Sequence, residues 1–375
     1  WEELASHAAA WSKALSDSSE AWLWLGSAHI RRQDWSAAEL AYREALRVEP
    51  SATYAGVALG RVLLAQDKAQ AALDVARSML RYRAEDARIW LTIAAAERAL
   101  GHANEANEAY TQSAQLEPWN SEAHTGLVHT ARLRGDWSGA LHAQRRVVQL
   151  DAENPVNWIE LASLYGGNGR LERALASAER AIALAPNNGD AWLFKGGALS
   201  GMKRHREAIE AMHKAIALKP HRMDWAWGWL ADIYYALRLF PQAIAAYREA
   251  QKLAPDDDAL KGRLAIALKD GLHLEEAMRV FEKLRDTHPE DPFAWRQIGF
   301  VNSYLGKAEV AIPAYEKSLS YDRKQGKVWA ALMEAYHSTG RREDMKRAYQ
   351  NLLSVDKTWA EQIYRKLILP YEVAP

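Results

Sequence analysis

The sequence predicts an all-α protein built from stacked helical repeats, and three observations lead to this prediction. Prolines recur at whole multiples of 34 residues, with one extra residue before the last two, at Pro50, Pro118, Pro186, Pro220, Pro255 and Pro289. An alanine keeps one place in successive units, at Ala38, Ala72, Ala106, Ala140, Ala174, Ala208, Ala243, Ala277 and Ala311. Aromatic and small residues recur in further columns at helical spacing. Self-similarity at such a period indicates a repeat architecture.

The first helix expected in each unit carries a large aromatic residue, followed four positions later by a small one. The aromatic residue is tryptophan in seven units, at Trp22, Trp90, Trp158, Trp192, Trp227, Trp295 and Trp329. The small residues are Gly26, Gly60, Ala94, Ala162, Gly196, Ala231, Ala265 and Gly299. Residues this small allow a second helix to approach closely.

The second helix of each unit is expected after a turn glycine, found at Gly101, Gly135, Gly169, Gly306 and Gly340. This helix carries a further aromatic residue, at Tyr42, Tyr110, Tyr247, Phe281, Tyr315 and Tyr349. The glycine is expected to end the first helix in a left-handed conformation. The proline is expected to open the next repeat, where its missing N–H costs nothing.

Together the columns give the pattern W-x2-L-[GA]…G…A-x3-[YF]…P, which resembles the tetratricopeptide repeat. The resemblance covers about residues 19–359 as ten units, of which only the tenth replaces the alanine, by Met345. It implies a right-handed superhelical solenoid of antiparallel helix pairs. Each unit would bury its apolar faces against its neighbours.

Both ends of the array are expected to carry helices outside the ten units. Residues 1–18 would form an N-terminal helix, either a cap or a truncated repeat, whose core columns hold Leu4, Ala8 and Trp11. Residues 360–375 would form a C-terminal capping helix and tail, the closing helix itself running over 359–369. Its apolar face would cover the last repeat with Ile363, Leu367 and Ile368.

One residue breaks the register of the array, between Pro220 and Trp227. An insertion at a turn between repeats can change the local superhelical angle. We therefore expect a kink between the sixth and seventh units.

The composition favours an ordinary globular chain. Its 375 residues include 48 Lys and Arg against 48 Asp and Glu, which argues against electrostatic capture of nucleic acid or anionic lipid. The absence of cysteine excludes a disulfide framework, a thiolate nucleophile and a Cys-ligated metal site. No apolar stretch approaches the length of a membrane span, so direct membrane insertion is not expected. Cytoplasm and periplasm both remain open.

No residue pattern predicts catalysis, a metal or a cofactor. The glycine-rich segment 166–170 lacks the Gly-Lys-Ser/Thr ending of a phosphate-binding loop. His205, His213 and His221 do not form the i, i+4 pair of a zinc helix. The acidic run at residues 256–258 lies in a turn between repeats, where Asp is favoured as a helix cap. We therefore expect a protein that is not an enzyme.

The resemblance implies that the second, fifth, ninth, twelfth and thirteenth positions of each unit face a concave groove. In the N-terminal half these positions supply the cations Arg61, Arg88, Arg98, His129 and Arg132. Such a run could meet an acidic peptide or a carboxylate. The alternative is that these side chains pair with nearby acids and solvate a helix face.

Small residues line the middle of the groove, at Ser163, Gly166, Gly167, Gly197, Ser200 and Gly201, and predict a wider, smoother channel. Aromatic residues follow in the C-terminal half, at Trp225, Trp229, Tyr235, Phe293, Phe300 and Tyr304. They could anchor a peptide or stack on sugar rings, although several could instead pack against the neighbouring repeat. Trp225 and Trp229 are the favoured anchors, because Trp227 already fills the core column between them.

Two specialisations of the family are not expected here. Members that grip the carboxylate of chaperones use Lys and Asn at groove positions where this chain has Leu23 and Ser27, then Val57 and Arg61. The asparagine ladder of glycosyltransferase arrays is also missing, since the corresponding positions begin with Trp24 and Ala58.

The sequence therefore predicts an interaction scaffold whose concave groove holds a segment of a protein or peptide partner. Two alternatives stay open: the periplasmic repeat region of a polysaccharide export or assembly system, where the groove would meet a glycan, and the adaptor region of a larger transferase. The start at Trp1 is expected of a processed product or a piece of a longer polypeptide. Self-association through the apolar ends of the solenoid is a further alternative.

Overall fold

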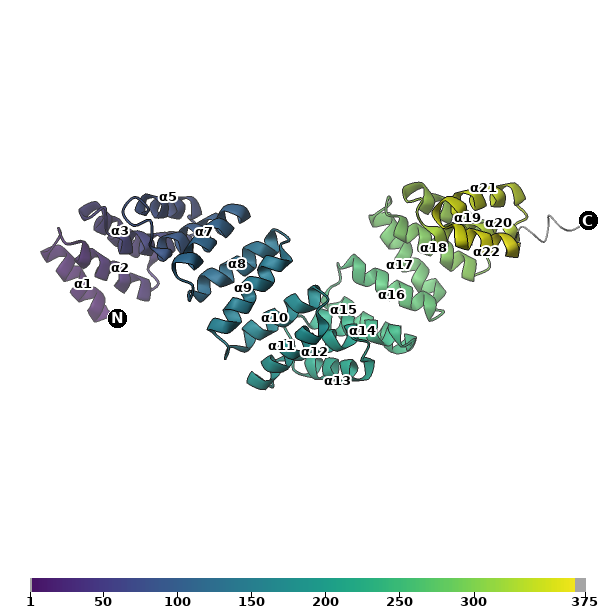
Figure 1. The fold of residues 1–375 in the computed structure, drawn as a ribbon, viewed down its shortest axis with the longest axis horizontal. Coiled ribbons are helices and arrows are strands. Elements are labelled where there is room, and N and C mark those ends of the chain that lie inside the picture. The colour runs from purple at the N-terminus through teal and green to yellow at the C-terminus, as the bar shows by residue number, and fades with distance from the viewer. Residues whose placement is uncertain (1, 368–375) are drawn as a thin grey trace, which may run out of the picture. The chain divides into compact units, whose positions relative to one another are not determined.

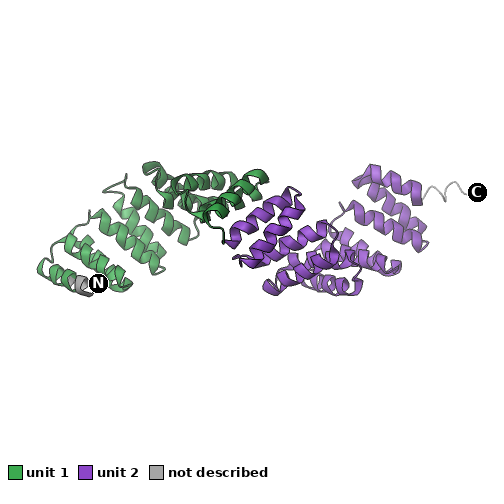
Figure 2. Ribbon diagram, turned by 90° about the horizontal axis from the view of Figure 1, so that it is seen from below, with its two compact units in different colours: residues 1–187 green, residues 188–375 purple. Residues whose placement is uncertain are grey.

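The computed structural model describes the backbone of residues 2–367, and the side chains of these residues apart from 2–5 and 9. All regular structure in this range is α-helical (Figure 1). The chain divides into two compact units, residues 1–187 and residues 188–375, each described here by itself (Figure 2).

The first unit holds helices α1 to α11. Their bounds are α1 Glu2–Ala14, α2 Ser19–Arg31, α3 Trp35–Val48, α4 Thr53–Ala65, α5 Ala69–Met79, α6 Ala87–Ala99, α7 Ala103–Leu116, α8 Ser121–Leu133, α9 Trp137–Leu150, α10 Pro155–Gly167 and α11 Leu171–Leu184.

The second unit holds helices α12 to α22. Their bounds are α12 Gly189–Gly201, α13 His205–Ala217, α14 Met223–Ala236, α15 Phe240–Leu253, α16 Asp258–Asp270, α17 Leu274–Thr287, α18 Pro292–Tyr304, α19 Ala308–Tyr321, α20 Gly326–Ser338, α21 Arg342–Val355 and α22 Lys357–Leu367.

Each even-numbered helix from α2 to α20 packs against the odd-numbered helix that follows it (Figure 1). A short turn joins the two, so they run antiparallel. Within each unit the second helix of a pair also packs against the first helix of the next pair. The predicted all-α array of helix pairs is confirmed.

The alanine and small-residue columns explain why the pairs pack closely. Ala38 and the alanines at equivalent positions are at most 2% exposed, and Met345 fills the same place in the tenth pair. A side chain at Gly26 would come within 2.6 Å of the Tyr42 ring, so only glycine leaves room for that ring. Tyr110 and Tyr315 face Gly126 and Gly299 in the same way, so three tyrosines of this column are buried where the facing helix presents no side chain.

The turns inside the ten pairs share one backbone conformation with positive φ. Five are the predicted glycines, Gly101, Gly135, Gly169, Gly306 and Gly340. The other five are residues with a side chain, Gln33, Asp67, Lys203, Arg238 and Leu272. The repeat therefore imposes the left-handed conformation even where the residue disfavours it.

The signature prolines do not occupy the first turn of a helix, so this expectation is wrong. Pro186 lies two residues before the N-cap Asn188 of α12, and Pro289 lies two residues before the N-cap Asp291 of α18. Both prolines lie two residues after the end of the preceding helix, which proline cannot continue. Proline occupies the first helical turn in α10 at Pro155, in α15 at Pro241 and in α18 at Pro292.

The extra residue between Pro220 and Trp227 lies inside α14. This helix has 14 residues, whereas the first helix of every other pair has 13. Lys219, just before Pro220, adopts a positive φ of 52° that has no counterpart at the ends of the other second helices in the described chain. A change of superhelical angle at this point stays a prediction.

The terminal helices are amphipathic. In α22 the residues Ile363 and Leu367 are buried, while Glu361, Gln362, Arg365 and Lys366 are exposed. In α1 the residue Ala8 is buried, whereas Trp11 remains 37% exposed. The expected contacts of Leu4 and Ile368 lie outside the described residues.

Candidate functional site

Three first helices of the second unit, α14, α16 and α18, lie next to one another. Asp232 of α14 pairs with Arg263 of α16 at 2.8 Å. The Lys269 ammonium of α16 lies 5.6 Å from the centre of the Tyr304 ring of α18. We call the surface formed by these helices along α16 the α16 groove.

One wall of the α16 groove is a cation and two indoles along one face of α14. Arg222, Trp225 and Trp229 stand at i, i+3 and i+7, so they lie above one another. The Arg222 guanidinium is 4.0 Å from the centre of the Trp225 ring, and the two indole centres are 5.6 Å apart. Arg222 also donates to Asp224 at 2.8 Å, which lowers the pKa of that carboxyl.

Trp229 packs backward onto α12. Its ring makes an edge contact with Phe194 at 6.1 Å between ring centres, and it covers Gly197, where an added side-chain carbon would lie 2.7 Å from the indole. The smooth channel expected at Gly197 is therefore wrong, because the indole fills the space that the missing side chain leaves.

The other wall of the groove is formed by the aromatic residues of α18. The Phe293 ring packs edge-on against Phe281 at 6.0 Å, and Phe300 packs edge-on against Tyr315 at 5.4 Å. Both rings are partly buried. Tyr304, at the C-terminal end of α18, is 61% exposed and open to a partner.

Helix α16 forms the floor, and its groove-facing residues at the N-terminal end are small or aliphatic. Ala259, Gly262 and Ile266 border a cavity of about 900 Å³ that Phe293 closes on one side. A second cavity of about 480 Å³ lies at the C-terminal end of α16. Tyr235 and Tyr304 are among the residues that line it. Cavities of this size accept side chains of a bound segment.

Polar groups converge at the C-terminal end of the groove. The Tyr235 hydroxyl donates to the Asp270 carboxylate at 2.5 Å, and Asp270 pairs with Lys269 at 2.9 Å. Burial, reinforced by the Asp270 carboxylate, raises the pKa of Tyr235 to about 12. The Lys269 ammonium also lies 5.7 Å from the Phe300 ring centre, so it connects α16 to the aromatic wall of α18.

The aromatic candidates fall into two groups by their contacts. Trp225 and Trp229 contact each other, and Trp229 packs on α12, whereas Tyr235, Phe293, Phe300 and Tyr304 lie next to residues of α16. Trp225 and Tyr304 present open surface, at 38% and 61%. Trp229, Phe293 and Phe300 largely pack against neighbouring helices, as the alternative interpretation expected.

The residues that sequence reasoning missed are those of α16. In the eighth unit, the positions that face the groove in the other units are occupied by Gly262, Ile266, Lys269 and Asp270. Applying those positions to the eighth unit as well could have found them.

The arginine candidates lie in the first unit, and three of them are paired with acids, two of these across helix pairs. Arg61 on α4 is 3.7 Å from Glu122, and Arg132 on α8 is 2.9 Å from Glu160. The positive run is thus partly neutralised, as the pairing alternative expected.

Arg98 on α6 lies close to His129 and to the Tyr110 hydroxyl. Burial, together with the charges of Arg98 and Arg132, lowers the pKa of His129. A hydrogen bond from Arg98 partly offsets the effect of burial, which raises the pKa of Tyr110.

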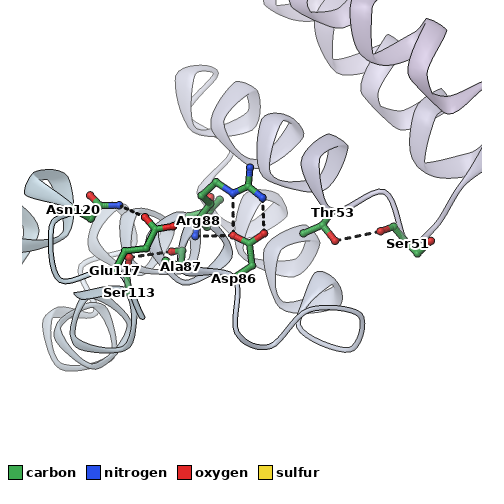
Figure 3. Close-up of polar contacts among 9 residues, drawn as sticks. Ser51, Thr53, Asp86, Ala87, Arg88, Ser113, Glu117 and Asn120 are labelled. Carbon is green, nitrogen blue, oxygen red and sulfur yellow. Dashed lines mark hydrogen bonds and ion pairs between the residues drawn. The ribbon is translucent and has the colours of Figure 1, made fainter. Parts of the chain in front are cut away.

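Arg88, at the start of α6, is held by its own helix cap (Figure 3). Its guanidinium makes two bonds to the Asp86 carboxylate, at 3.0 and 2.7 Å. Because α5 ends early at Met79, the residues after it border a cavity of about 760 Å³ beside Arg88. With this ion pair already formed, Arg88 offers less charge to a partner than the sequence indicates.

Three of the other polar candidates have structural contacts. Asp257 caps α16 by accepting the Leu260 N–H at 2.9 Å, as predicted. His221 pairs with Asp190, and His213 lies 3.1 Å from the Tyr234 hydroxyl. Among the side chains that the structure describes, no group of three or more His, Asp or Glu residues could hold a metal ion. No helix in that range is long and apolar enough to cross a membrane.

The sequence profile of the tetratricopeptide repeat matches residues 4–55, 23–88, 159–222, 200–258 and 230–292. These segments together cover more than half of the chain. No curated protein matches the chain.

Several solved structures are similar in backbone. The structure of pilF from Pseudomonas aeruginosa is 18% identical, with 56% of this chain and 96% of that chain covered at a TM-score of 0.48. A tetratricopeptide repeat protein from Parabacteroides merdae is 16% identical, with 67% and 98% covered at 0.46. YrrB, described as having an unusual peptide-binding site, is 17% identical, with 50% and 95% covered at 0.46.

Proposed function

Since the chain belongs to the tetratricopeptide repeat family, we propose that it is a non-enzymatic scaffold that binds a segment of a protein partner in the α16 groove. The repeats mark the chain as a protein–protein interaction scaffold. The proposal adds where on this chain the partner docks.

One observation carries the choice of site: aromatic side chains border two cavities along a single helix. Phe293 borders the cavity of about 900 Å³ at one end of α16, and the exposed Tyr304 borders the cavity of about 480 Å³ at the other end. Aromatic residues beside pockets are the usual anchors of protein interfaces. Because the walls are fixed by packing against Gly197, Phe281 and Tyr315, little ordering entropy is lost on docking.

The arginine-bearing face of the first unit supports the proposal less well. Arg61, Arg88 and Arg132 are engaged with Glu122, Asp86 and Glu160. A partner there would have to break these pairs, and exposed pairs contribute little new affinity.

The test selects binding peptides from a random library displayed on phage, using the whole chain as bait. Peptides are then measured by fluorescence anisotropy on wild type and on Trp225→Ala and Tyr304→Ala. We expect each substitution to weaken binding about tenfold or more, the effect of losing an interface anchor. The matched control is Trp119→Ala, because Trp119 is 70% exposed in the first unit.

Equal binding by wild type and both groove variants would contradict the proposal. Loss of binding in Trp119→Ala alone would move the site to the first unit. A parallel glycan array, in which wild type binds and Trp225→Ala does not, would instead favour the polysaccharide alternative.

A further inference from the structure

Small residues of α16 determine the shape of the larger cavity of the α16 groove. Ala259 stands where α14 carries Trp225 and α18 carries Phe293, so the surface sinks at this point of α16. A side-chain carbon on Gly262 would lie 3.3 Å from the Phe293 ring, which is tighter than ordinary contact. The glycine therefore sets the space between α16 and that ring.

The surface that lines the cavity is mainly apolar. Ile266 and Leu284 line it together with Phe293, in a space of about 900 Å³. Such a volume accommodates one bulky apolar side chain and the backbone that carries it. Transfer of that side chain from water provides the main free-energy gain of docking.

The rim of the cavity carries an excess of negative charge. Its arginine is already engaged, because Arg263 pairs with Asp232 at 2.8 Å, and the His288 ring lies 2.8 Å from Asp258. Two carboxylates remain: Asp291, which accepts one backbone N–H from Phe293, and Glu290. Glu290 is exposed and has no hydrogen-bond or ion-pair partner among residues 2–367.

We propose that this cavity takes a bulky apolar side chain of the partner segment, and that Glu290 and Asp291 hold a Lys or Arg next to it in the partner's sequence. The inference rests on the proposed function and names the chemistry of the partner. The apolar residue supplies affinity, and the charge at the rim supplies selectivity and faster association. A segment with an acidic neighbour at that place would be repelled.

The test repeats the peptide selection with two variants that alter the cavity separately. Gly262→Leu fills the space beside Phe293, and Glu290→Lys reverses one exposed charge without touching the interior. The matched controls are Gly166→Leu, at a helical glycine with no atom within 4 Å, and Glu282→Lys, on the exposed face of α17. Circular dichroism verifies the helicity of every variant.

We expect wild type to enrich peptides in which a bulky apolar residue adjoins Lys or Arg. Gly262→Leu should bind them about tenfold more weakly, and Glu290→Lys several-fold more weakly, with a loss that shrinks at high salt. Both controls should bind as wild type does. If Gly262→Leu loses helicity, Glu290→Lys decides the outcome, because it leaves the packing intact.

Three results would overturn the inference. One is enrichment of acidic or purely polar peptides, and another is no enrichment over the Gly262→Leu bait. The third is unchanged affinity in both cavity variants. If Trp225→Ala and Tyr304→Ala still weaken binding in that case, the proposed function stands and only the chemistry of the partner is wrong. If none of the four substitutions matters, both proposals fall.

Discussion

The indole of Trp229 occupies the place of the side chain that Gly197 lacks. A side-chain carbon built on Gly197 would lie 2.7 Å from Cζ3 of that indole, although the two residues belong to different helix pairs. The glycine of α12 and the tryptophan of α14 thus form one packing unit. Neither residue can be understood from its own repeat.

This packing unit predicts that Gly197→Ala changes stability in opposite directions in wild type and in a Trp229→Ala background. In wild type, Gly197→Ala should lower stability by about 1 kcal/mol, because the cost of overpacking, about 2 kcal/mol, exceeds the gain in helix propensity, about 1 kcal/mol. In a Trp229→Ala background the clash is absent, so Gly197→Ala should raise stability by about 1 kcal/mol. Urea midpoints followed by circular dichroism measure both effects.

Gly166→Ala serves as the control for this cycle, since a side chain at Gly166 would meet no atom within 4 Å. It should stabilise the chain in both backgrounds. If Gly197→Ala is stabilising in wild type as well, the indole is free to move and does not rest on α12.

The residues of positive φ in the turns predict that two substitutions change stability in opposite directions. Leu272 has φ 65° and is 73% exposed, so its side chain gains little from packing while its backbone is strained. Leu272→Gly should therefore raise stability by about 1 kcal/mol. Gly306→Ala, at the equivalent turn with no atom nearby, should lower it by a similar amount. Thermal unfolding midpoints that move in the same direction for both would contradict the assignment of strain.

The buried carboxylate of Glu97 in the first unit predicts that replacing its exposed partner Arg77 lowers stability strongly. The Glu97 side chain is 2% exposed and is held by Arg77 at 2.5 Å and His102 at 2.8 Å. Arg77→Leu should cost about 2 kcal/mol, less than a fully buried pair because His102 remains and Arg77 is half exposed. Adding Glu97→Leu should recover part of the loss, since no unpaired charge would remain. A double variant less stable than Arg77→Leu would contradict this account.

Tyr235 predicts a loss of stability in alkaline solution. Its pKa is raised above the ordinary value of 10.0 to about 12, so its neutral form is favoured in the folded chain. This contribution is fully present below pH 10 and is lost as the pH rises through 12. Urea midpoints should therefore fall less steeply between pH 10 and 12 in Tyr235→Phe than in wild type. Tyr54→Phe, at a 57% exposed tyrosine of α4, should keep the wild-type slope.

Most of the fold could be predicted from the sequence because each column of the repeat has a local cause. The alanine and aromatic columns mark the faces that pack, and five glycines mark turns of positive φ. The turn at Leu272 could not be identified from its own residue, because the repeat imposes a conformation that leucine disfavours. Its place could be inferred only from the spacing of the other turns.

The candidate site was only partly predictable. The aromatic positions were found because the family places them in the groove, and Trp225 and Tyr304 are indeed exposed. The covering of Gly197 by Trp229 depends on contact between different repeats, which the columns of a single unit do not contain. For the same reason the sequence left open whether Arg132 pairs with an acid, and the structure pairs it with Glu160 on the next first helix.

The shared conformation of the turns makes the chain tolerant of losing a whole unit. Removal of residues 102–135 would join Gly101 to Asp136, which restores the Gly-Asp junction already present at Gly135. Both glycines have positive φ, so the new junction meets no unfamiliar backbone. A single recombination event can therefore shorten or lengthen the array in steps of one unit. The unit containing α14 is different, because its extra residue would have to leave with it.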